Sequence, residues 1–411
     1  MVTAESSSPD LEHTDIPPIV AATWETPVVD AHRVQKALEL LWGQLRIEQG
    51  ETGGSRGDAD EYEQMRASTL NLIVLAGTTE GAQAVHRTIA ELTEYCPSRA
   101  AILVTDGPDV ASDDLTIRAA VHEQPRGKTE QPIRYETITV MANRRRDASL
   151  VNIASTLLVP ELPDFLWWHA PSIASGSLFD ELVSISDRLI VDTANLAHIA
   201  EAFPLLARLG TGERPVTRLS DLAWARLTPW RQIVAQFFDP ADARACLDTI
   251  DEIEIEYGGE MSHLPSGMTT GLLMVGWLAT RLGWQSPGEL VKTREGWRVT
   301  LRAGKTGRRR EIILRMKATD DPTSSGILRS VKIDCADPAC GSFRVERVDM
   351  QCLTTQSQVG DASAMTRMVH TRASHPEDLI TDELRMFGRD AVYEDALAFA
   401  ATLLPMGETE G

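Results

Sequence analysis

Two cysteines separated by four residues form the sharpest chemical motif in the sequence. Cys335 and Cys340 lie in the stretch DCADPACG, which also contains Pro338 and Gly341 and separates two predicted strands. A loop of this length can bring two sulfur atoms to bonding distance, so the motif predicts a reversible dithiol that stiffens the loop when oxidised. Two unpaired, partly buried cysteines are the alternative, and they are favoured over the dithiol. A zinc site is disfavoured because the CxxC spacing is missing.

A second motif, AGTTEGAQ, joins an apolar stretch to a helical one. Backbone amides at a helix N-terminus can hold an anion, which makes four residues candidates for binding a sugar phosphate or a nucleotide: Gly77, Thr78, Thr79 and Gly81. The motif lacks the G-x-G-x-x-G spacing of dinucleotide-binding loops, and no lysine follows Gly81 as in a P-loop. The spacing favours the alternative, an ordinary strand-to-helix turn with a threonine cap.

Tryptophan and arginine supply candidate contacts for a protein partner. Trp167 and Trp168 are consecutive on a predicted strand, so they point to opposite faces and core packing is the favoured role. At the carboxyl end of a strand, however, one ring can emerge where α/β sheets meet ligands or partners. The sequence RAGKTGRRRE forms a basic turn on an acidic chain, and its arginines can bind an acidic surface or a phosphate: Arg308, Arg309 and Arg310.

The motifs give no support for catalysis. The sequence contains no H-E-x-x-H metalloprotease motif and no DxDxDG calcium loop, and its nine histidines are scattered. We therefore expect no catalytic residues, no metal and no resident cofactor.

The composition fits a globular chain that binds neither nucleic acid nor membranes. Of its 411 residues 43% are apolar, enough to bury sizeable cores. Forty basic and sixty acidic residues give a net charge of −20, which repels phosphodiester backbones and anionic lipid headgroups. The apolar stretch at residues 268–280 is too short to span a bilayer. The amino-terminal residues lack the pattern of a secretory signal, so the cytoplasm is the expected location.

The pattern of apolar segments predicts two domains. Residues 66–210 alternate strands and helices, which predicts a Rossmann-like three-layer α/β sandwich with a mostly parallel sheet and an antiparallel hairpin at its edge. Residues 211–405 predict an α+β domain with an antiparallel sheet and a helix that is apolar nearly all round. A carboxyl-terminal helix is expected at about residues 382–404, packed on that sheet.

An acidic segment, residues 1–65, precedes these domains. Its serine-, proline- and glycine-rich parts are expected to be largely flexible. An amphipathic helix is predicted at residues 30–46. We expect its apolar stripe to dock on this chain rather than on another protein; the stripe consists of Val34, Leu38, Leu41, Trp42 and Leu45.

Three segments together resemble the glucose-6-phosphate dehydrogenase assembly protein family, OpcA: residues 69–104, 157–171 and 187–194. The most specific part lies in LLVPELPDFLWWHAP, which combines Pro160, Leu162 and Pro163 with the tryptophan pair. The resemblance covers about residues 66–405. It implies a cytoplasmic, non-catalytic protein that binds glucose-6-phosphate dehydrogenase, favours its active oligomer and raises its activity in the oxidative pentose phosphate pathway, which supplies NADPH.

The same family is linked to thioredoxin control of this dehydrogenase through cysteines, which adds thioredoxin as a candidate partner. The assignment of Cys335 and Cys340 to such control is an inference from their spacing alone. Two alternatives stay open. One is an enzyme or sensor that binds a sugar phosphate or nucleotide at residues 77–81, and the other is a redox-regulated scaffold with a different client.

Overall fold

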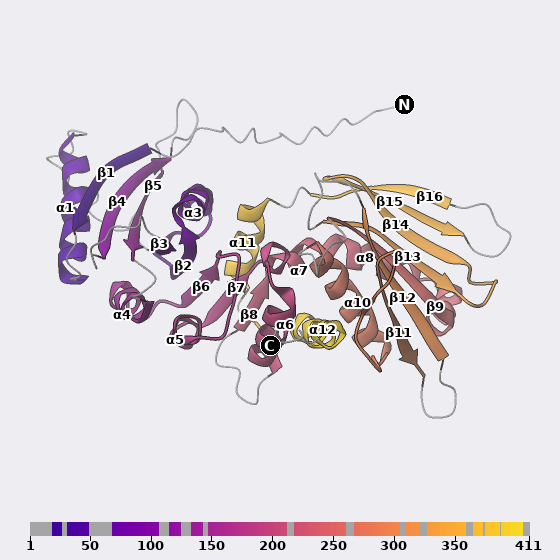
Figure 1. Ribbon diagram of the computed structural model, residues 1–411. Coiled ribbons are helices and arrows are strands. Elements are labelled where there is room, and N and C mark those ends of the chain that lie inside the picture. Colours follow the sequence, from indigo (N-terminus) through magenta and orange to yellow (C-terminus); the bar gives the residue numbers. More distant parts are fainter. Residues whose placement is uncertain are drawn as a thin grey trace, which may run out of the picture.

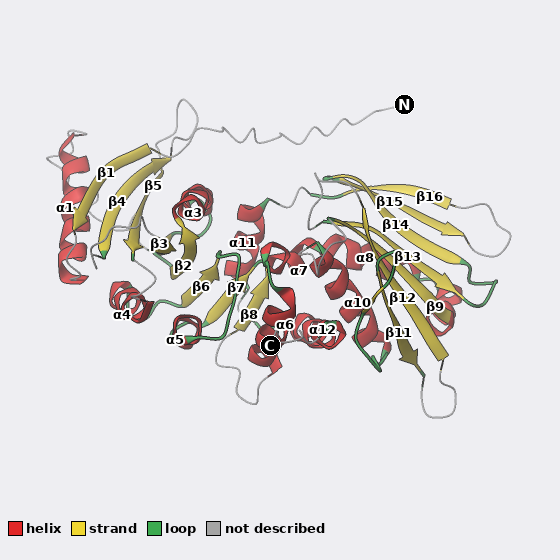
Figure 2. Ribbon diagram, viewed as in Figure 1, coloured by secondary structure: helices red, strands yellow, loops and turns green. Residues whose placement is uncertain are grey.

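Two eight-stranded sheets, with helices between and beside them, make up the described part of the protein (Figures 1 and 2). Strands β1 to β8 form sheet 1 and strands β9 to β16 form sheet 2. The expected fold class is confirmed: a mostly parallel α/β unit is followed by a mostly antiparallel one. The computed structural model describes residues 19–26, 31–48, 68–106, 115–124, 133–142, 147–211, 218–259, 267–304, 310–319, 327–358, 365–372, 375–386 and 388–405.

Sheet 1 has the strand order β1-β4-β5-β3-β2-β6-β7-β8. From β5 to β8 in this order neighbouring strands are parallel, whereas β4 pairs antiparallel with β5 and β1 pairs antiparallel with β4. The doubly wound topology therefore reverses direction between β2 and β6. The strands are β1 (Ile19–Thr26), β2 (Leu70–Thr78), β3 (Ser98–Asp106), β4 (Thr116–Gln124), β5 (Ile133–Met141), β6 (Asp164–Trp168), β7 (Arg188–Val191) and β8 (Arg218–Asp221).

Helices cover both faces of sheet 1. β2 is buried from Leu70 to Gly77 because it lies between these layers, as its continuous apolar sequence predicts. One face packs against α3 (Thr79–Leu92), α7 (Leu222–Arg226) and α11 (Pro376–Arg385). The other packs against α1 (Ala31–Glu48), α4 (Asp147–Leu157), α5 (Ser177–Ser184) and α6 (Ile199–Thr211).

The amino-terminal helix α1 docks on β1 and β4 of its own chain, as expected. All five residues of its predicted stripe are buried. The strand before it is a difference from the expectation of a flexible segment, because residues 19–26 form β1. β1 pairs with β4 and takes the sheet edge that the sequence assigns to the β4–β5 hairpin.

Sheet 2 has the order β10-β11-β12-β9-β13-β14-β15-β16 and is antiparallel except for the parallel pair β9–β12. In β9 (Ile250–Gly258) the side chains of Ile253, Ile255 and Tyr257 are buried, and the intervening glutamates are half-buried on the opposite face. The other strands are β10 (Val291–Lys292), β11 (Trp297–Ala303), β12 (Arg310–Thr319), β13 (Leu328–Cys335), β14 (Ser342–Asp349), β15 (Cys352–Gln358) and β16 (Met365–His370).

Helices also line the inner face of sheet 2. The central one is α10 (Met268–Leu282), whose residues are buried nearly all round, as its sequence predicts. α8 (Thr228–Phe237) packs beside β14, and α9 (Ala241–Arg244) continues into the 3-10 helix η3 (Ala245–Thr249) directly before β9. A second 3-10 helix, η2 (Thr193–Asn195), follows β7 in sheet 1.

The junction of the two units differs from the sequence-based expectation in two places. Residues 218–221 form β8 and pair with β7, so sheet 1 extends past the expected boundary at residue 210. The single carboxyl-terminal helix is divided into α11 and α12 (Ala391–Leu403). α11 packs on α3 and α7, and α12 packs between α6 and α10 rather than on sheet 2.

Arg188 on β7 contacts the segment that joins α11 to α12. Its guanidinium donates hydrogen bonds to the carbonyl oxygens of Met386 (2.6 Å), the residue that follows α11, and of Gly388 (2.8 Å). A single cluster of buried apolar residues includes members of sheet 1, α10, α12 and sheet 2. The two units therefore share one hydrophobic core.

Candidate functional site

The turn between β2 and α3 is occupied by its own side chains. The Thr78 hydroxyl caps α3 and accepts a hydrogen bond of 3.0 Å from the Gly81 amide, so this amide is not free for an anion. Glu80 places a carboxylate in the first turn of α3, where it would repel a phosphate. Thr79 is exposed. The threonine cap favoured by the sequence is thus the arrangement that the structure contains.

The two glycines of this turn serve close packing. Gly77 has a φ of +73°, which side-chain-bearing residues rarely adopt. A Cβ atom on Gly81 would lie 2.5 Å from the Ala76 carbonyl oxygen, and one on Gly77 would lie 3.3 Å from the Ala170 Cβ. Ala170 follows β6, so the segments after β2 and after β6 approach each other closely at the point where the doubly wound sheet reverses direction.

Acidic residues at the carboxyl ends of β7 and β8 are held by internal contacts. Asp192 receives two hydrogen bonds from the Arg226 guanidinium, at 2.7 and 2.8 Å. The Asp221 carboxylate accepts bonds from the Thr193 amide (3.0 Å) and hydroxyl (2.6 Å). Burial raises the pKa of Asp221 to about 6, although these hydrogen bonds favour the ionised form. The oxygen atoms of both carboxylates thus accept hydrogen bonds from neighbouring residues of the same chain.

His169 is the polar residue at this edge of sheet 1 that sequence reasoning missed. It directly follows Trp168, and its Nδ1 atom is buried without a hydrogen-bond partner in the described part of the chain. Burial lowers the pKa of His169, which favours the neutral ring, while the Asp192 carboxylate opposes this effect. The sequence could have indicated His169 because it directly follows a predicted strand, and ligands of α/β sheets bind beyond the carboxyl ends of the strands.

The structure pairs Cys340 differently from the sequence-based expectation. Cys340 forms a disulfide with Cys246 in η3, and Cys335 is a free, half-buried thiol. The structure therefore contains neither the Cys335–Cys340 bond nor two unpaired cysteines at these positions. Cys335 is the last residue of β13 and its amide bonds to the Gly341 carbonyl, while Asp337 organises the turn that carries Cys340. Cys246 lies 94 residues before Cys340 and has no local sequence signal.

The three cysteines nevertheless lie together. The Cys335 thiol donates a hydrogen bond of 3.6 Å to the Cys246 carbonyl oxygen. Burial raises the pKa of Cys335, and the nearby carboxylates of Asp251 and Asp334 raise it further, which favours the protonated thiol. The disulfide joins η3 to the β13–β14 loop at one end of sheet 2.

The tryptophan pair is part of the core rather than of an exposed surface. Trp167 and Trp168 are 3% and 6% exposed, so neither ring emerges at the sheet tip, and the favoured expectation of core packing agrees with the structure. The Trp168 indole donates to the Ser172 carbonyl at 2.9 Å and stacks edge-on against Phe179. Each ring lies between sheet 1 and one of its helix layers, which is the role that core packing predicts.

The arginine turn is described only at its end. Arg308 and Arg309 lie outside the described residues. Arg310 begins β12 and is half-buried, because its guanidinium donates a hydrogen bond of 3.0 Å to the Leu247 carbonyl in η3. This residue therefore lies next to the disulfide-bearing segment.

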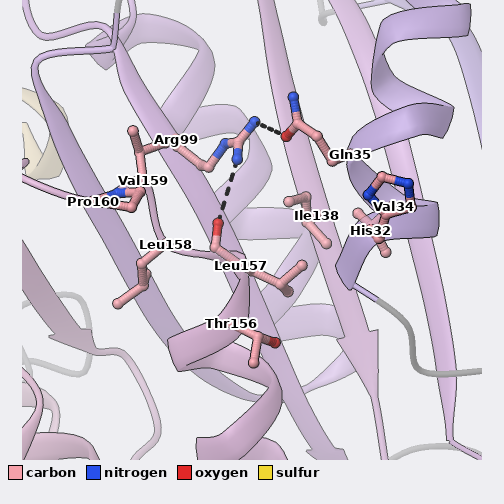
Figure 3. A pocket seen from close by; sticks show the side chains of 10 residues that line it. All are labelled: His32, Val34, Gln35, Arg99, Ile138, Thr156, Leu157, Leu158, Val159 and Pro160. Atoms are coloured by element: carbon pink, nitrogen blue, oxygen red, sulfur yellow. Dashed lines mark hydrogen bonds between the residues drawn. The ribbon is translucent and has the colours of Figure 1, made fainter.

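A cavity of about 390 Å³ opens between α1, β3 and the end of α4, at the amino ends of the parallel strands (Figure 3). The Arg99 guanidinium donates to Gln35 and to the Glu136 carboxylate, each at 2.9 Å. The Trp42 indole donates to the same carboxylate at 3.0 Å. Because Glu136 already balances the charge of Arg99, these groups hold α1 in place rather than form an anion site.

The described residues contain neither a metal-binding cluster nor a helix that could span a membrane. They contain no group of three or more His, Cys, Asp or Glu side chains that could hold a metal ion. None of their helices is both long enough and apolar enough to cross a membrane.

Comparison with protein families matches the two units of the fold in turn. Residues 90–208 match the glucose-6-phosphate dehydrogenase subunit N-terminal domain, and residues 217–397 match the C-terminal domain of the same subunit. The chain belongs to the OpcA family. The resemblance drawn from the sequence is thereby confirmed.

Two curated relatives carry the name OpcA and are placed by name in the OxPP cycle. The relative from Synechocystis sp. is 26% identical over 310 residues, which cover 72% of this chain and 62% of the relative. The relative from Synechococcus elongatus is 26% identical over 278 residues, or 66% of this chain and 59% of the relative. This OpcA chain spans about three fifths of the length of the curated relatives it matches.

Solved structures resemble this OpcA protein in fold alone. An oxidoreductase from Sinorhizobium meliloti aligns with a TM-score of 0.41 and 13% identity, covering 82% of this chain and 88% of the other. The transcriptional regulator Gal80p from Kluyveromyces lactis aligns with a TM-score of 0.43 and 12% identity, covering 82% and 87%.

Proposed function

We propose that this chain is a cytoplasmic, non-catalytic assembly factor and allosteric activator of glucose-6-phosphate dehydrogenase in the oxidative pentose phosphate pathway. The observation that carries the proposal is the consecutive match of both units, residues 90–208 and 217–397, to a family named for a subunit of this dehydrogenase. Activation of the dehydrogenase would increase NADPH supply. The protein partner is the enzyme itself, and no cofactor is required.

The geometry of sheet 1 supports an activator over a dinucleotide-binding enzyme. The Thr78 cap uses the Gly81 amide that would otherwise face a phosphate, and Glu80 adds a negative charge to the first turn of α3. An activator needs only a surface with different affinities for two states of its partner. A folded exterior that favours the active oligomer provides this without a catalytic acid or base.

The proposal is tested by kinetics of the cognate dehydrogenase with and without the purified full chain. We expect a higher kcat, a lower KM for glucose 6-phosphate, or both, together with a larger oligomer in light scattering. Unchanged kinetics and an unchanged oligomer at saturating chain would refute activation. Calorimetry of the chain alone with NADP and glucose 6-phosphate should show no binding, whereas tight binding would favour a sugar-phosphate sensor.

Redox modulation is a second part of the proposal and uses the Cys246–Cys340 disulfide. Disulfides of cytosolic proteins are usually transient or redox-sensing. Thioredoxin is the candidate reductant: its dithiol would supply two electrons and two protons, break the S–S bond and leave two thiols. Reduction would release η3 from the β13–β14 loop. The kinetic assay repeated after dithiothreitol tests this, and a reductant response unaltered in Cys340→Ser would refute it.

A further inference from the structure

Three of the four sheet edges carry features that hinder the addition of another strand. β1 has a bulge between Val20 and Ala22 and is covered on one face by α1. β8 has four residues, three of them buried, and β10 has only two residues. These are the means by which proteins commonly protect sheet edges.

The fourth edge, β16, has none of these features. It contains six residues and no proline, and it pairs with β15 along its length without a register shift. On its other side no strand is hydrogen-bonded to it within the described part of the chain. Figure 1 shows β16 at the margin of sheet 2, away from the helices that line the sheet. Its outer row of backbone N–H and C=O groups can therefore pair with an added strand.

Apolar side chains project from both faces of β16. Met365 is 57% exposed and Met368 is 63% exposed, and they lie on opposite faces because successive side chains alternate along a strand. The intervening Thr366 and Arg367 are exposed as well. Exposed methionine is common at protein-binding surfaces, because its flexible thioether adapts to different partners.

The charge around β16 is opposite to that of the whole protein. Residues 365–372 contain Arg367, His370 and Arg372 but no acidic residue, whereas the chain has a net charge of −20. β15 has no charged residue at all. The local surface therefore favours an acidic partner strand. A second copy of β16 is disfavoured because two arginine-bearing strands would be placed side by side.

We propose that β16 binds an extended segment of the partner dehydrogenase as a ninth strand of sheet 2. This segment carries apolar side chains that contact Met365 and Met368, and an acidic side chain that pairs with Arg367. Main-chain hydrogen bonds supply affinity and the side chains supply specificity, as in other cases of strand addition. The inference rests on the proposed function, because it names the surface at which the dehydrogenase is bound.

Binding of the cognate dehydrogenase to the full chain tests the inference through two exposed positions. Met368→Glu and Arg367→Glu should each weaken binding and raise the Kd by about tenfold or more, because each adds negative charge opposite an acidic strand. Val291→Glu is the matched control: Val291 is 65% exposed on β10, at the opposite edge of the same sheet. Its Kd should stay within about twofold of the unaltered chain.

Hydrogen exchange of the complex provides a second measurement that needs no substitution. Amides of β16 should become protected when the dehydrogenase is added, whereas amides of β1 should not change. Normal binding by both β16 variants, without protection of β16, would overturn the edge-strand proposal and leave the proposed function intact. No binding by the unaltered chain would overturn both. Protection of β16 in a dimer of this chain alone would show that β16 pairs with a second copy and not with the dehydrogenase, which would also overturn the proposal.

Discussion

The Asp221 carboxylate at the end of β8 accepts a hydrogen bond of 3.1 Å from the Tyr393 hydroxyl on α12. The two residues are 172 positions apart in the sequence and almost completely buried. The same carboxylate caps α7 through the Ala223 amide and accepts two bonds from Thr193. One buried acid thus ties the carboxyl-terminal helix to the carboxyl edge of sheet 1.

Asp221 should make stability depend on pH in a definite direction. Its pKa rises from 3.8 to about 6 on folding, so the folded state holds the proton more tightly than the unfolded state. The stability that the protonated Asp221 side chain adds to the folded state is therefore fully present below pH 3.8 and is lost as the pH rises through 6. The difference corresponds to about 3 kcal/mol.

The substitution Asp221→Asn isolates this contribution, because it removes the titration. Measured by urea unfolding, the variant should become more stable relative to the unaltered chain by about 2 kcal/mol between pH 4.5 and pH 7, because part of the loss has already occurred at pH 4.5. Asp395→Asn, in an exposed ion pair with Arg281, is the control and should show a much smaller change. A constant difference between the Asp221 variant and the unaltered chain at all pH values would contradict the assignment.

Loss of the Cys246–Cys340 disulfide should lower stability under oxidising conditions. The bond joins residues 94 positions apart, and a crosslink over such a span restricts the unfolded chain strongly. We expect Cys340→Ser to reduce the free energy of unfolding by about 2 to 5 kcal/mol, measured by denaturant titration.

The effect of a reductant on the Tm of the unaltered chain and of two serine variants shows which cysteines are bonded. Dithiothreitol should lower the Tm of the unaltered chain to that of Cys340→Ser, which itself should not respond. Cys335→Ser should keep the full response because Cys335 is a free thiol. If Cys335→Ser instead abolished the response, the loop pairing predicted from the sequence would be correct.

Arg99 should be needed to hold α1 on the sheet. Its side chain and that of Glu136 are 13% and 12% exposed, so Arg99→Ala leaves a carboxylate poorly solvated and without its main partner. We expect a loss of about 3 kcal/mol in unfolding free energy and faster hydrogen exchange in α1. Arg118→Ala is the control, because its ion pair with Glu25 is about half exposed and should contribute less than about 1 kcal/mol.

The Thr78 cap should contribute to stability but not to ligand binding. Thr78→Ala removes the oxygen that accepts from the Gly81 amide and should cost about 1 kcal/mol, measured by denaturant titration. Thr78→Ser should retain most of this contribution, and Thr79→Ala should have little effect because Thr79 is exposed. Thermal stabilisation of the unaltered chain by phosphate, lost in Thr79→Ala, would show that the turn binds anions.

Long periodic segments explain what the sequence could predict. β2 was recognisable because it is apolar throughout, and α1 because Leu38 and Trp42 recur at helical spacing. α10 was recognisable from its apolar circumference. In each case burial imposes a pattern on neighbouring residues, so the local sequence carries the information.

The missed features depend on partners far away in the chain. β1 has the sequence IVAATWET within an acidic segment, and it is a strand because β4 offers an unpaired edge. β8 is only four residues long and is extended because it pairs with β7. Cys246 finds Cys340 only after η3 and the β13–β14 loop are placed together. Such features follow from tertiary pairing and leave no periodic signal.

The hydrophobic cluster that runs from sheet 1 through α10 and α12 into sheet 2 has a consequence for dissecting the protein. A fragment ending near residue 210 would lack β8, α10 and α12, and would expose the apolar side of α6 to water. The complementary fragment would retain β8 without the strand it pairs with. Neither half should melt cooperatively by itself, so calorimetry of the intact chain should give a single endotherm rather than two.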